Sequence, residues 1–335
     1  MKRQKDLSVN ILGIETTCDE TSFALVQDGT KVIHEVTMSQ VAKHAPYGGV
    51  VPELGAREHV KNIEQLGGKF FEGIKGNTIS AIAVASKVGL PPAVQVGESY
   101  AHALAQALQV PLIPINHVVA HVWGILVDDS FIVKPTFPFL GLIVSGGHTQ
   151  LIDFSSPTEF DILGETLDDA IGEAFDKVAS VLGLPYPGGP EIERISEKGD
   201  SHAIPLPIPL EHDDTMNFSF AGLKTAVRTY VEKELAKQHD KYKEFFVADV
   251  AASFQRVAFT HIAQKAEKAL KQTGYKQLVV GGGVAASQRL TDILFSYFEE
   301  KEIKVELFVP NRKYCTDNAS VIAGYASNLM PNNGI

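Results

Sequence analysis

Cysteine is scarce in this sequence of 335 residues, which contains only Cys18 and Cys315. Two cysteines cannot supply the disulfide framework of a small secreted protein, so we expect a protein of the reducing cytoplasm. Long apolar runs are also absent, since none reaches the roughly 18 residues that a membrane helix requires. The basic start leads into a short apolar segment that meets Glu15 and Asp19, which predicts a first strand instead of a signal peptide.

Positive charge is scarce as well. Thirty Lys and Arg residues face forty Asp and Glu residues, which gives a formal net charge of -10. This balance argues against broad, unaided binding of a nucleic acid polyanion. The basic spots, Arg57 with Lys61 and Arg312 with Lys313, are small. Nucleic acid binding would therefore need a composite surface or a basic partner.

Two kinds of segment occur twice along the chain. Residues 9–29 and 137–156 each have the pattern of a strand, a turn of small polar residues and a second strand. Residues 79–86 and 277–283 each have the continuous apolar pattern of a parallel strand buried on both faces, followed by a helix. The repeat predicts two similar α/β domains around a central cleft.

We expect the first domain to span residues 1–115 and the second to span 116–335. The second would carry helical insertions, and the final helix would pack back on the first domain. Expected helices and loops follow from periodicity, glycine and proline. The helices are 50–76, 100–108, a helix from 175, 219–237, 244–273 and a helix from 286; the loops are 87–99, 185–200 and 203–217.

The segment 116–124, NHVVAHVWG, holds two histidines four residues apart. Asn116 is a good N-cap, so His117 and His121 are expected on one face of a helix, about 6 Å apart at Cβ. This spacing suits two ligands of one metal, and the alternative is two partly buried core histidines. Val118 stands where the zinc-protease motif H-E-x-x-H needs its glutamate. Asp317, before the last helix, is a third ligand or a helix cap.

Glycine-bearing turns offer a second kind of site. Gly146 and Gly147 lie between two strands, as a plain hairpin turn or as a phosphate cradle with Ser145 as an extra donor. Three glycines at 281–283 lie between a buried strand and a helix, without the dinucleotide-binding spacing G-x-G-x-x-G. Asp176 precedes a Gly-Gly turn, either to bind ribose hydroxyls or as part of a solvated helix face.

Eight motifs in order, among them GIETTCDETSFALV, NHVVAHVWG, LIVSGGHTQL, GETLDDAIGEAFDKVASVLGLPYPGGP and CTDNASVIAG, closely resemble the TsaD family. These are the tRNA threonylcarbamoyladenosine transferases, formerly described as O-sialoglycoprotein endopeptidases. The resemblance runs from about Val9 to Asn328. It implies an actin-like ATPase (ASKHA) fold. It also implies one divalent transition metal per chain, Fe²⁺ first and Zn²⁺ second, on His117, His121 and Asp317.

The resemblance further implies an adenine nucleotide ligand, which is threonylcarbamoyl-AMP, ATP or AMP. Its implied contacts are Ile143, Val144, Ser145, Gly146, Gly147, Asp176, Gly189, Glu193 and Ser287. Many relatives have Asp at the position of Glu193 and Asn at that of Ser287, which puts a ribose contact and an amide contact in doubt. Archaeal relatives have Tyr where this chain has Ile143, so the chain is similar to the bacterial or organellar type.

The implied reaction is transfer of threonylcarbamoyl from its adenylate to the exocyclic amine of adenosine 37 in tRNAs that read ANN codons. An adenine amine is a weak nucleophile, so the site must align both partners. His148 and Glu15 are the candidate bases, by their positions in the turns. Implied partners are tRNA, a TsaB-like actin-fold paralogue, a TsaE-like small ATPase and a TsaC-like synthase that supplies the adenylate. Mitochondrial relatives act alone.

Two other functions stay open on the sequence. A metalloprotease would fit the older family description, but Val118 occupies the position of its glutamate base. An actin-like ATPase or kinase would fit the fold, but such enzymes normally hold Mg²⁺ through phosphates and water. The absence of an Arg- and Ser-rich leader favours a bacterial cytoplasm.

Overall fold

The computed structural model describes residues 8–235 and 243–330. The chain forms two compact units. Unit 1 consists of the described parts of Met1–His44, Val50–Lys134 and Thr316–Ile335, and unit 2 consists of those of Ala45–Gly49 and Pro135–Cys315. Each unit is built on its own five-stranded mixed sheet, as the α/β prediction requires.

The sheet of unit 1 has the order β3-β2-β1-β4-β5. Its strands are β1 (Asn10–Glu15), β2 (Glu20–Gln27), β3 (Lys31–Ser39), β4 (Ala81–Ser86) and β5 (Leu112–Asn116). The first three strands are antiparallel neighbours, whereas β4 is parallel to both β1 and β5. This unit also has short helical elements: α1 (Val41–His44), α4 (His117–Ala120), η2 (His121–Trp123) and α5 (Gly124–Val127).

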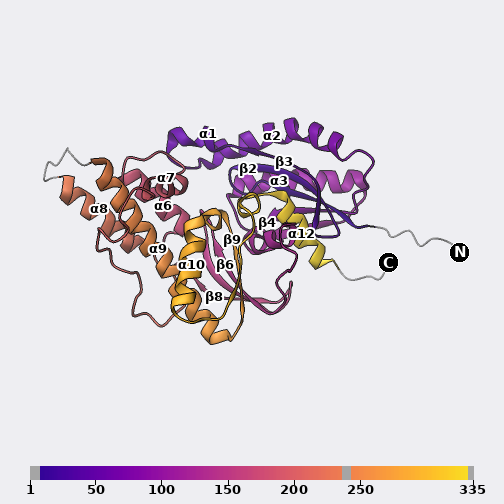
Figure 1. Cartoon of the computed structure of the whole chain (residues 1–335). Helices are drawn as coiled ribbons and strands as arrows, with labels where there is room; N and C mark the ends of the chain where they lie inside the picture. Colours follow the sequence, from indigo (N-terminus) through magenta and orange to yellow (C-terminus); the bar gives the residue numbers. More distant parts are fainter. Residues whose placement is uncertain (1–7, 236–242, 331–335) are drawn as a thin grey trace. The chain divides into compact units, whose positions relative to one another are not determined.

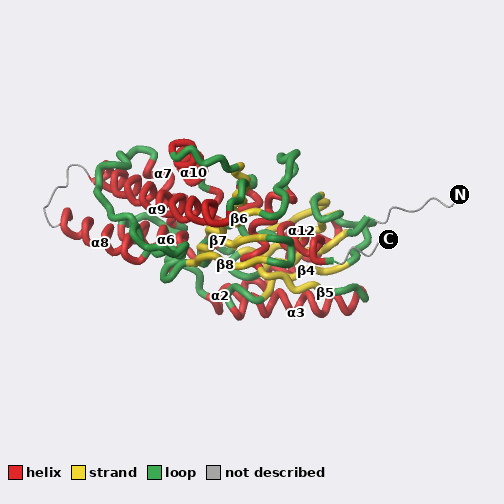
Figure 2. The backbone as a smooth tube through the Cα atoms, turned by 90° about the horizontal axis from the view of Figure 1, so that it is seen from below, coloured by secondary structure: helices red, strands yellow, loops and turns green. Residues whose placement is uncertain are grey.

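Three longer helices cover the two faces of this sheet (Figure 2). Helices α2 (Pro52–Gly73) and α3 (Pro91–Leu108) lie side by side on one face (Figure 1), where they bury Leu12 and Ile14. Helix α12 (Ala319–Leu329) covers the other face, which Gly13 presents because side chains alternate along a strand. A Cβ on Gly13 would lie 2.1 Å from the carbonyl oxygen of Ala319, so this close packing requires glycine.

Unit 2 repeats the topology with the order β10-β9-β6-β7-β8. Its strands are β6 (Phe139–Val144), β7 (Thr149–Phe154), β8 (Phe160–Glu165), β9 (Gln277–Gly281) and β10 (Glu306–Phe308). Its helical elements are η1 (Ala45–Tyr47), α6 (Ile171–Val181), α7 (Gly188–Ser196), α8 (Ala221–Leu235), α9 (Lys243–Thr273), η4 (Gly283–Ala286), α10 (Gln288–Glu300) and α11 (Arg312–Cys315). Read from β8, each strand has its counterpart in unit 1, so the predicted duplication is confirmed.

The division of the chain differs from the boundary expected after residue 115. The structure keeps residues 116–134 in unit 1 and returns residues 316–330 to it. The reason is packing, because α12 contacts α4, η2 and α5 as well as the sheet. The rings of Trp123 and Tyr325, for example, have centroids 4.1 Å apart. The final helix thus packs with the N-terminal strands, as expected.

Two predicted loops contain helices. Residues 87–99 were expected as a loop, but α3 begins at Pro91, since proline is tolerated in the first turn where an N–H is unpaired anyway. Residues 185–200 were also expected as a loop, but α7 begins at Gly188. A Cβ on Gly188 would lie 2.7 Å from Cα of Asp176, so glycine there reflects packing and not a turn. Residues 205–208 lie in a loop, as expected, and the predicted helix end at Lys237 lies outside the described residues.

Adjacent aspartates tie α6 and α8 together in unit 2. Asp168 accepts hydrogen bonds from Phe220 N (2.8 Å) and Ala221 N (3.1 Å) at the start of α8. Asp169 accepts from Lys177 Nζ (2.6 Å) and Lys224 Nζ (2.5 Å). Burial by itself would raise the pKa of Asp169, but these lysines hold it below its ordinary value.

We therefore expect Asp169→Asn to lower the free energy of unfolding by about 1 kcal/mol at pH 7. A carboxyl whose folded pKa is depressed stabilises the protein above its unfolded pKa, and this is lost as the pH falls through the folded pKa. The gap between variant and parent should thus shrink below about pH 4 in urea unfolding curves. Asp214→Asn, which changes an exposed partner of Lys268, is the control and should have almost no effect. An equal loss at pH 7 and pH 3 would contradict the assignment.

Candidate metal centre and ligand cavity

The histidine pair in unit 1 lies on a helical segment that begins as predicted. Asn116 Oδ1 accepts hydrogen bonds from the backbone N–H groups of Val118 (3.0 Å) and Val119 (3.3 Å). The segment is α-helical through Ala120 and then tightens to a 3₁₀ turn from His121. The imidazoles of His117 and His121 remain neighbours, with ring centroids 4.6 Å apart, and both are buried.

Asp317 joins the two histidines from the end of the chain. Its Oδ1 lies 3.5 Å from His117 Nε2 and 3.7 Å from His121 Nε2. One ligand atom from each of the three residues lies within 4.8 Å of the others. The alternative role of Asp317 as a helix cap is wrong, because Asn318 caps α12 by accepting from Val321 N at 3.0 Å.

Glu15 fixes the orientation of the first histidine. Its Oε2 lies 2.8 Å from His117 Nδ1, and its Oε1 accepts from Thr17 N at 2.5 Å. Burial by itself would raise the pKa of Glu15, but His117 holds it below its ordinary value. A proton on Nδ1 of His117 leaves Nε2 with its lone pair on the side of Asp317. Both oxygens of Glu15 are therefore engaged, one by His117 and one by the backbone of Thr17.

The donor set fits a transition metal ion. Two imidazole nitrogens and one carboxylate oxygen suit iron or zinc and leave positions open. A carboxylate behind the ligating histidine is the usual supporting arrangement of such sites. Burial disfavours charge on His117, yet Glu15 and Asp317 raise its pKa to about 9, so the surroundings favour a positive charge. These two carboxylates would favour a bound cation in the same way.

The cysteines offer no competing chemistry. Burial, reinforced by the carboxylates of Asp317 and Asp19, raises the pKa of the Cys18 thiol far above its ordinary value. Cys315 is buried, and its Sγ donates to the carbonyl oxygen of Pro310 at 3.3 Å. A thiol that stays protonated is a poor nucleophile, so Cys18 does not resemble a catalytic cysteine.

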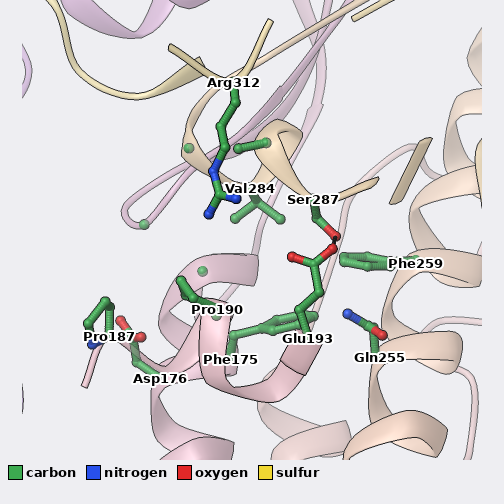
Figure 3. A pocket seen from close by; sticks show the side chains of 15 residues that line it. Phe175, Asp176, Pro187, Pro190, Glu193, Gln255, Phe259, Val284, Ser287 and Arg312 are labelled. Atoms are coloured by element: carbon green, nitrogen blue, oxygen red, sulfur yellow. Dashed lines mark hydrogen bonds between the residues drawn. The ribbon is translucent and has the colours of Figure 1, made fainter. Parts of the chain in front are cut away.

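Unit 2 holds a cavity of about 180 Å³ (Figure 3). Five of the residues that the resemblance implies for nucleotide binding line it: Gly146, Asp176, Gly189, Glu193 and Ser287. They come from the β6–β7 turn, α6, α7 and the start of α10, so the fold gathers residues that are up to 141 positions apart. Residues so far apart in the sequence meet in one cavity only because the chain folds, so their meeting supports the idea that they form one site.

The other four implied residues do not line the cavity. Ile143 and Val144 are fully buried in β6. Ser145 lies in the hairpin, where its Oγ accepts from His148 N at 3.1 Å and its own N–H donates to the carbonyl oxygen of His148 at 2.8 Å. Gly147 lies in the same turn. The hairpin interpretation of this segment is therefore confirmed, and of its residues only Gly146 faces the cavity.

Both carboxylates of the cavity are held in place. Asp176 Oδ1 accepts from Gly188 N at 2.7 Å, at the start of α7. Glu193 Oε1 accepts from Ser287 Oγ at 2.9 Å, a bond drawn in Figure 3. Two residues that the resemblance implies for nucleotide binding are thus direct partners.

Several cavity residues were not predicted from the sequence. Phe175 and Phe259 form an aromatic wall, with ring centroids 5.3 Å apart, and Gln255 and Arg312 also face the cavity. Phe175 and Phe259 come from helices whose apolar spacing is that of ordinary core residues. The one available signal was that Phe175 directly precedes Asp176. Apolar walls with a few convergent polar groups are typical of small-molecule sites.

Among the described residues, no helix is both long and apolar enough to cross a membrane.

Comparison with known proteins is consistent with this geometry. The family model of TsaD, tRNA N6-adenosine threonylcarbamoyltransferase, matches residues 31–324. The tRNA N6-adenosine threonylcarbamoyltransferase of Mesoplasma florum is 41% identical over 320 residues, covering 95% of this chain and 98% of the relative. That of Carboxydothermus hydrogenoformans is 44% identical over 313 residues, covering 93% and 90%.

Solved structures support the fold at low sequence identity. T. kodakarensis HypF has a TM-score of 0.64 at 12% identity, over 97% of this chain and 49% of that one. Component A of the Acidaminococcus fermentans (R)-2-hydroxyglutaryl-CoA dehydratase has a TM-score of 0.52 at 15% identity, over 96% and 100%. The fold is therefore the actin-like ATPase fold, as predicted.

Proposed function

The chain belongs to the TsaD family of tRNA N6-adenosine threonylcarbamoyltransferases, and from this premise we propose that it forms threonylcarbamoyladenosine in tRNA. The donor is threonylcarbamoyl-AMP, and the acceptor is the N6 amine of adenosine 37 in tRNAs that read ANN codons. The amine nitrogen bonds to the carbamoyl carbon, the bond from that carbon to the phosphate oxygen breaks, N6 loses a proton and AMP leaves. The family match carries this proposal.

The cavity of unit 2 is the proposed site of the adenylate. The carboxylates of Asp176 and Glu193 are acceptors for ribose hydroxyls, and the aromatic wall of Phe175 and Phe259 suits an apolar surface of the ligand. An added Cβ at Gly146 or Gly189 would meet no heavy atom within 4 Å, so their backbone is open to the ligand. An ATP- or AMP-bound form would use the same groups.

The proposed metal ligands are His117, His121 and Asp317, with one Fe²⁺ per chain as the first candidate and Zn²⁺ as the second. Such an ion would supply Lewis-acid polarisation of a carbonyl or hold a carboxylate. Glu15 keeps His117 in the ligating tautomer. His148, in the β6–β7 turn, stays the candidate base; Ile143 and Val144 end the strand before this turn, and Ser145 and Gly147 lie in it.

The proposed partners follow from the family and from charge. A net charge of -10 opposes tRNA, so a TsaB-like paralogue and a TsaE-like small ATPase would complete the RNA-binding surface in the cytoplasm. A TsaC-like synthase would supply the adenylate. The protease alternative has no support in the His pair, because Val118, in the position of the glutamate base, is an apolar core residue.

The test is mass spectrometry of nucleosides from an ANN-decoding tRNA. The tRNA is incubated with this protein and a threonylcarbamoyl-adenylate generating system, with and without the two partners. We expect threonylcarbamoyladenosine at position 37, and a tRNA with guanosine at that position should stay unmodified. Metal-dependent cleavage of a glycoprotein, with no modified nucleoside in any combination of partners, would overturn the proposal.

Replacing the group behind His117 tests the metal centre separately. We expect Glu15→Gln to weaken metal binding about 10- to 100-fold, because the amide is a poorer partner for Nδ1–H. Competition with a chelator gives the affinity without any assay of activity. Glu20→Gln is the control, since burial and Asp19 raise the pKa of Glu20 to about 10 and leave it neutral already. Equal metal affinity in Glu15→Gln and the parent would contradict the role of Glu15.

A further inference from the structure

Arg312 is the one cationic side chain among the described residues that line the cavity of unit 2. It begins α11 and is solvent-exposed, and its guanidinium points into the cavity (Figure 3). Within the described chain it forms no ion pair or hydrogen bond. A charged fork of five donors therefore faces the cavity with its hydrogen-bonding capacity unused.

The charges of the cavity are separated in space. Arg312 enters from the top of the view, whereas Asp176 lies at the lower left and the carboxylate of Glu193 lies at the right, beside Ser287 (Figure 3). Both carboxylates are already fixed, by Gly188 N and by Ser287 Oγ. Carboxylates attract hydroxyl donors and repel phosphates, whereas guanidinium binds phosphate through paired hydrogen bonds. An adenylate in this cavity would thus turn its ribose toward the acids and its phosphate toward Arg312.

The open backbone of the cavity agrees with this orientation. Gly146 and Gly283 line it, and an added Cβ at either would meet no heavy atom within 4 Å. A phosphate can approach bare backbone closely. The aromatic wall of Phe175 and Phe259 lies near Glu193 in Figure 3, away from the guanidinium. The part of the cavity near the guanidinium, which would bind an anion, is therefore distinct from the part lined by the aromatic wall.

We propose that Arg312 binds the phosphate of the adenylate and stabilises AMP as the leaving group. This inference rests on the function proposed above. As N6 bonds to the carbamoyl carbon, the carbon–oxygen bond breaks and its electron pair goes to the phosphate. The phosphate has about one negative charge in the adenylate and about 1.5 to 2 in AMP at pH 7. A fixed guanidinium interacts more strongly with the growing charge, which lowers the barrier.

The neighbouring Lys313 provides a matched control. Its Nζ lies 4.3 Å from the centroid of the Tyr314 ring, and it does not line the cavity. The two residues are adjacent, basic and exposed, so they would contribute similarly if this segment only attracted tRNA. Of the two, only Arg312 lines the cavity.

The experiment compares AMP with adenosine by calorimetry, using the full chain and three variants. For Arg312→Gln we expect AMP affinity to fall about 10- to 30-fold and adenosine affinity to change less than about 2-fold. The AMP affinity of Arg312→Lys should lie between those of Arg312→Gln and the parent. Lys313→Gln should bind AMP as tightly as the parent. Single-turnover formation of the modified nucleoside should slow about 10- to 100-fold in Arg312→Gln at saturating tRNA.

Three results would overturn the inference. One is an equal loss of AMP and adenosine affinity, and another is no loss of either. The third is a fall in tRNA affinity, with AMP binding intact, that Lys313→Gln reproduces. Because AMP binding is measured without turnover, failure to modify tRNA would count against the proposed function and leave the phosphate contact standing.

Discussion

Asp317→Ala should purify as a folded protein that carries almost no metal and forms no threonylcarbamoyladenosine. Its carboxylate lies 3.5 Å and 3.7 Å from the two imidazoles, so its loss leaves only two protein ligands. Metal affinity should fall by more than about 100-fold, since removing even a supporting group costs 10- to 100-fold. Metal analysis of the purified protein and nucleoside mass spectrometry measure the two effects.

The adjacent residue separates metal binding from folding. Asn318→Ala removes the cap of α12 and should cost about 1 kcal/mol of unfolding free energy, while metal content stays near that of the parent. Asp317→Ala should show the reverse, with circular dichroism unchanged. Full metal occupancy in Asp317→Ala, or loss of metal in Asn318→Ala alone, would show that the assignment of the two residues is wrong.

Gly146→Val should abolish stabilisation by AMP. At a concentration of one hundred times its Kd, a ligand stabilises its protein by about 2.7 kcal/mol, which raises the melting temperature by several degrees. The valine side chain would enter the cavity that Asp176 also lines, and its Cβ would meet no heavy atom within 4 Å, so the protein should fold. Thermal shift with and without AMP measures the effect.

Gly147→Val is the matched variant. Gly147 lies in the same turn with the same open surroundings, but it does not line the cavity. Its response to AMP should therefore stay close to that of the parent. If both variants lost the shift, the turn as a whole would bind the nucleotide, as the sequence suggested. If both kept it, the cavity would not be the AMP site.

The strands of the fold were predictable because the burial of a strand determines the apolar pattern of its own few residues. Both repeats place apolar runs beside turns of small residues, and this alternation predicted β1, β2, β6 and β7. The start of α3 was not predictable in the same way. Pro91 and Pro92 suggest a loop, yet the first turn of a helix tolerates them. Gly188 was likewise ambiguous, because only the contact with Asp176 explains it.

The sites divide along the same line. The spacing of His117 and His121 suggested a metal pair or two core histidines, whereas the ligand role of Asp317 came from the family resemblance. The sequence suggested Glu15 as a base. Its contact with His117, 102 residues away, could not be predicted from local sequence. Gly146 and Gly147 are indistinguishable in the sequence, and only the three-dimensional packing decides which one faces a cavity. Contacts between distant segments are what local patterns leave out.

The return of α12 to unit 1 has a consequence for synthesis. The strands of unit 1 are complete once residue 116 has been made, yet the face at Gly13 stays bare until residues 316–329 leave the ribosome. Domains fold as units, N-terminal first, during translation, and this unit must wait for the other to be made. A prematurely terminated chain would hold both histidines without Asp317. The proposed metal site is thus complete only in a chain that reaches Asp317, and a shorter chain would expose an apolar sheet face to chaperones and proteases.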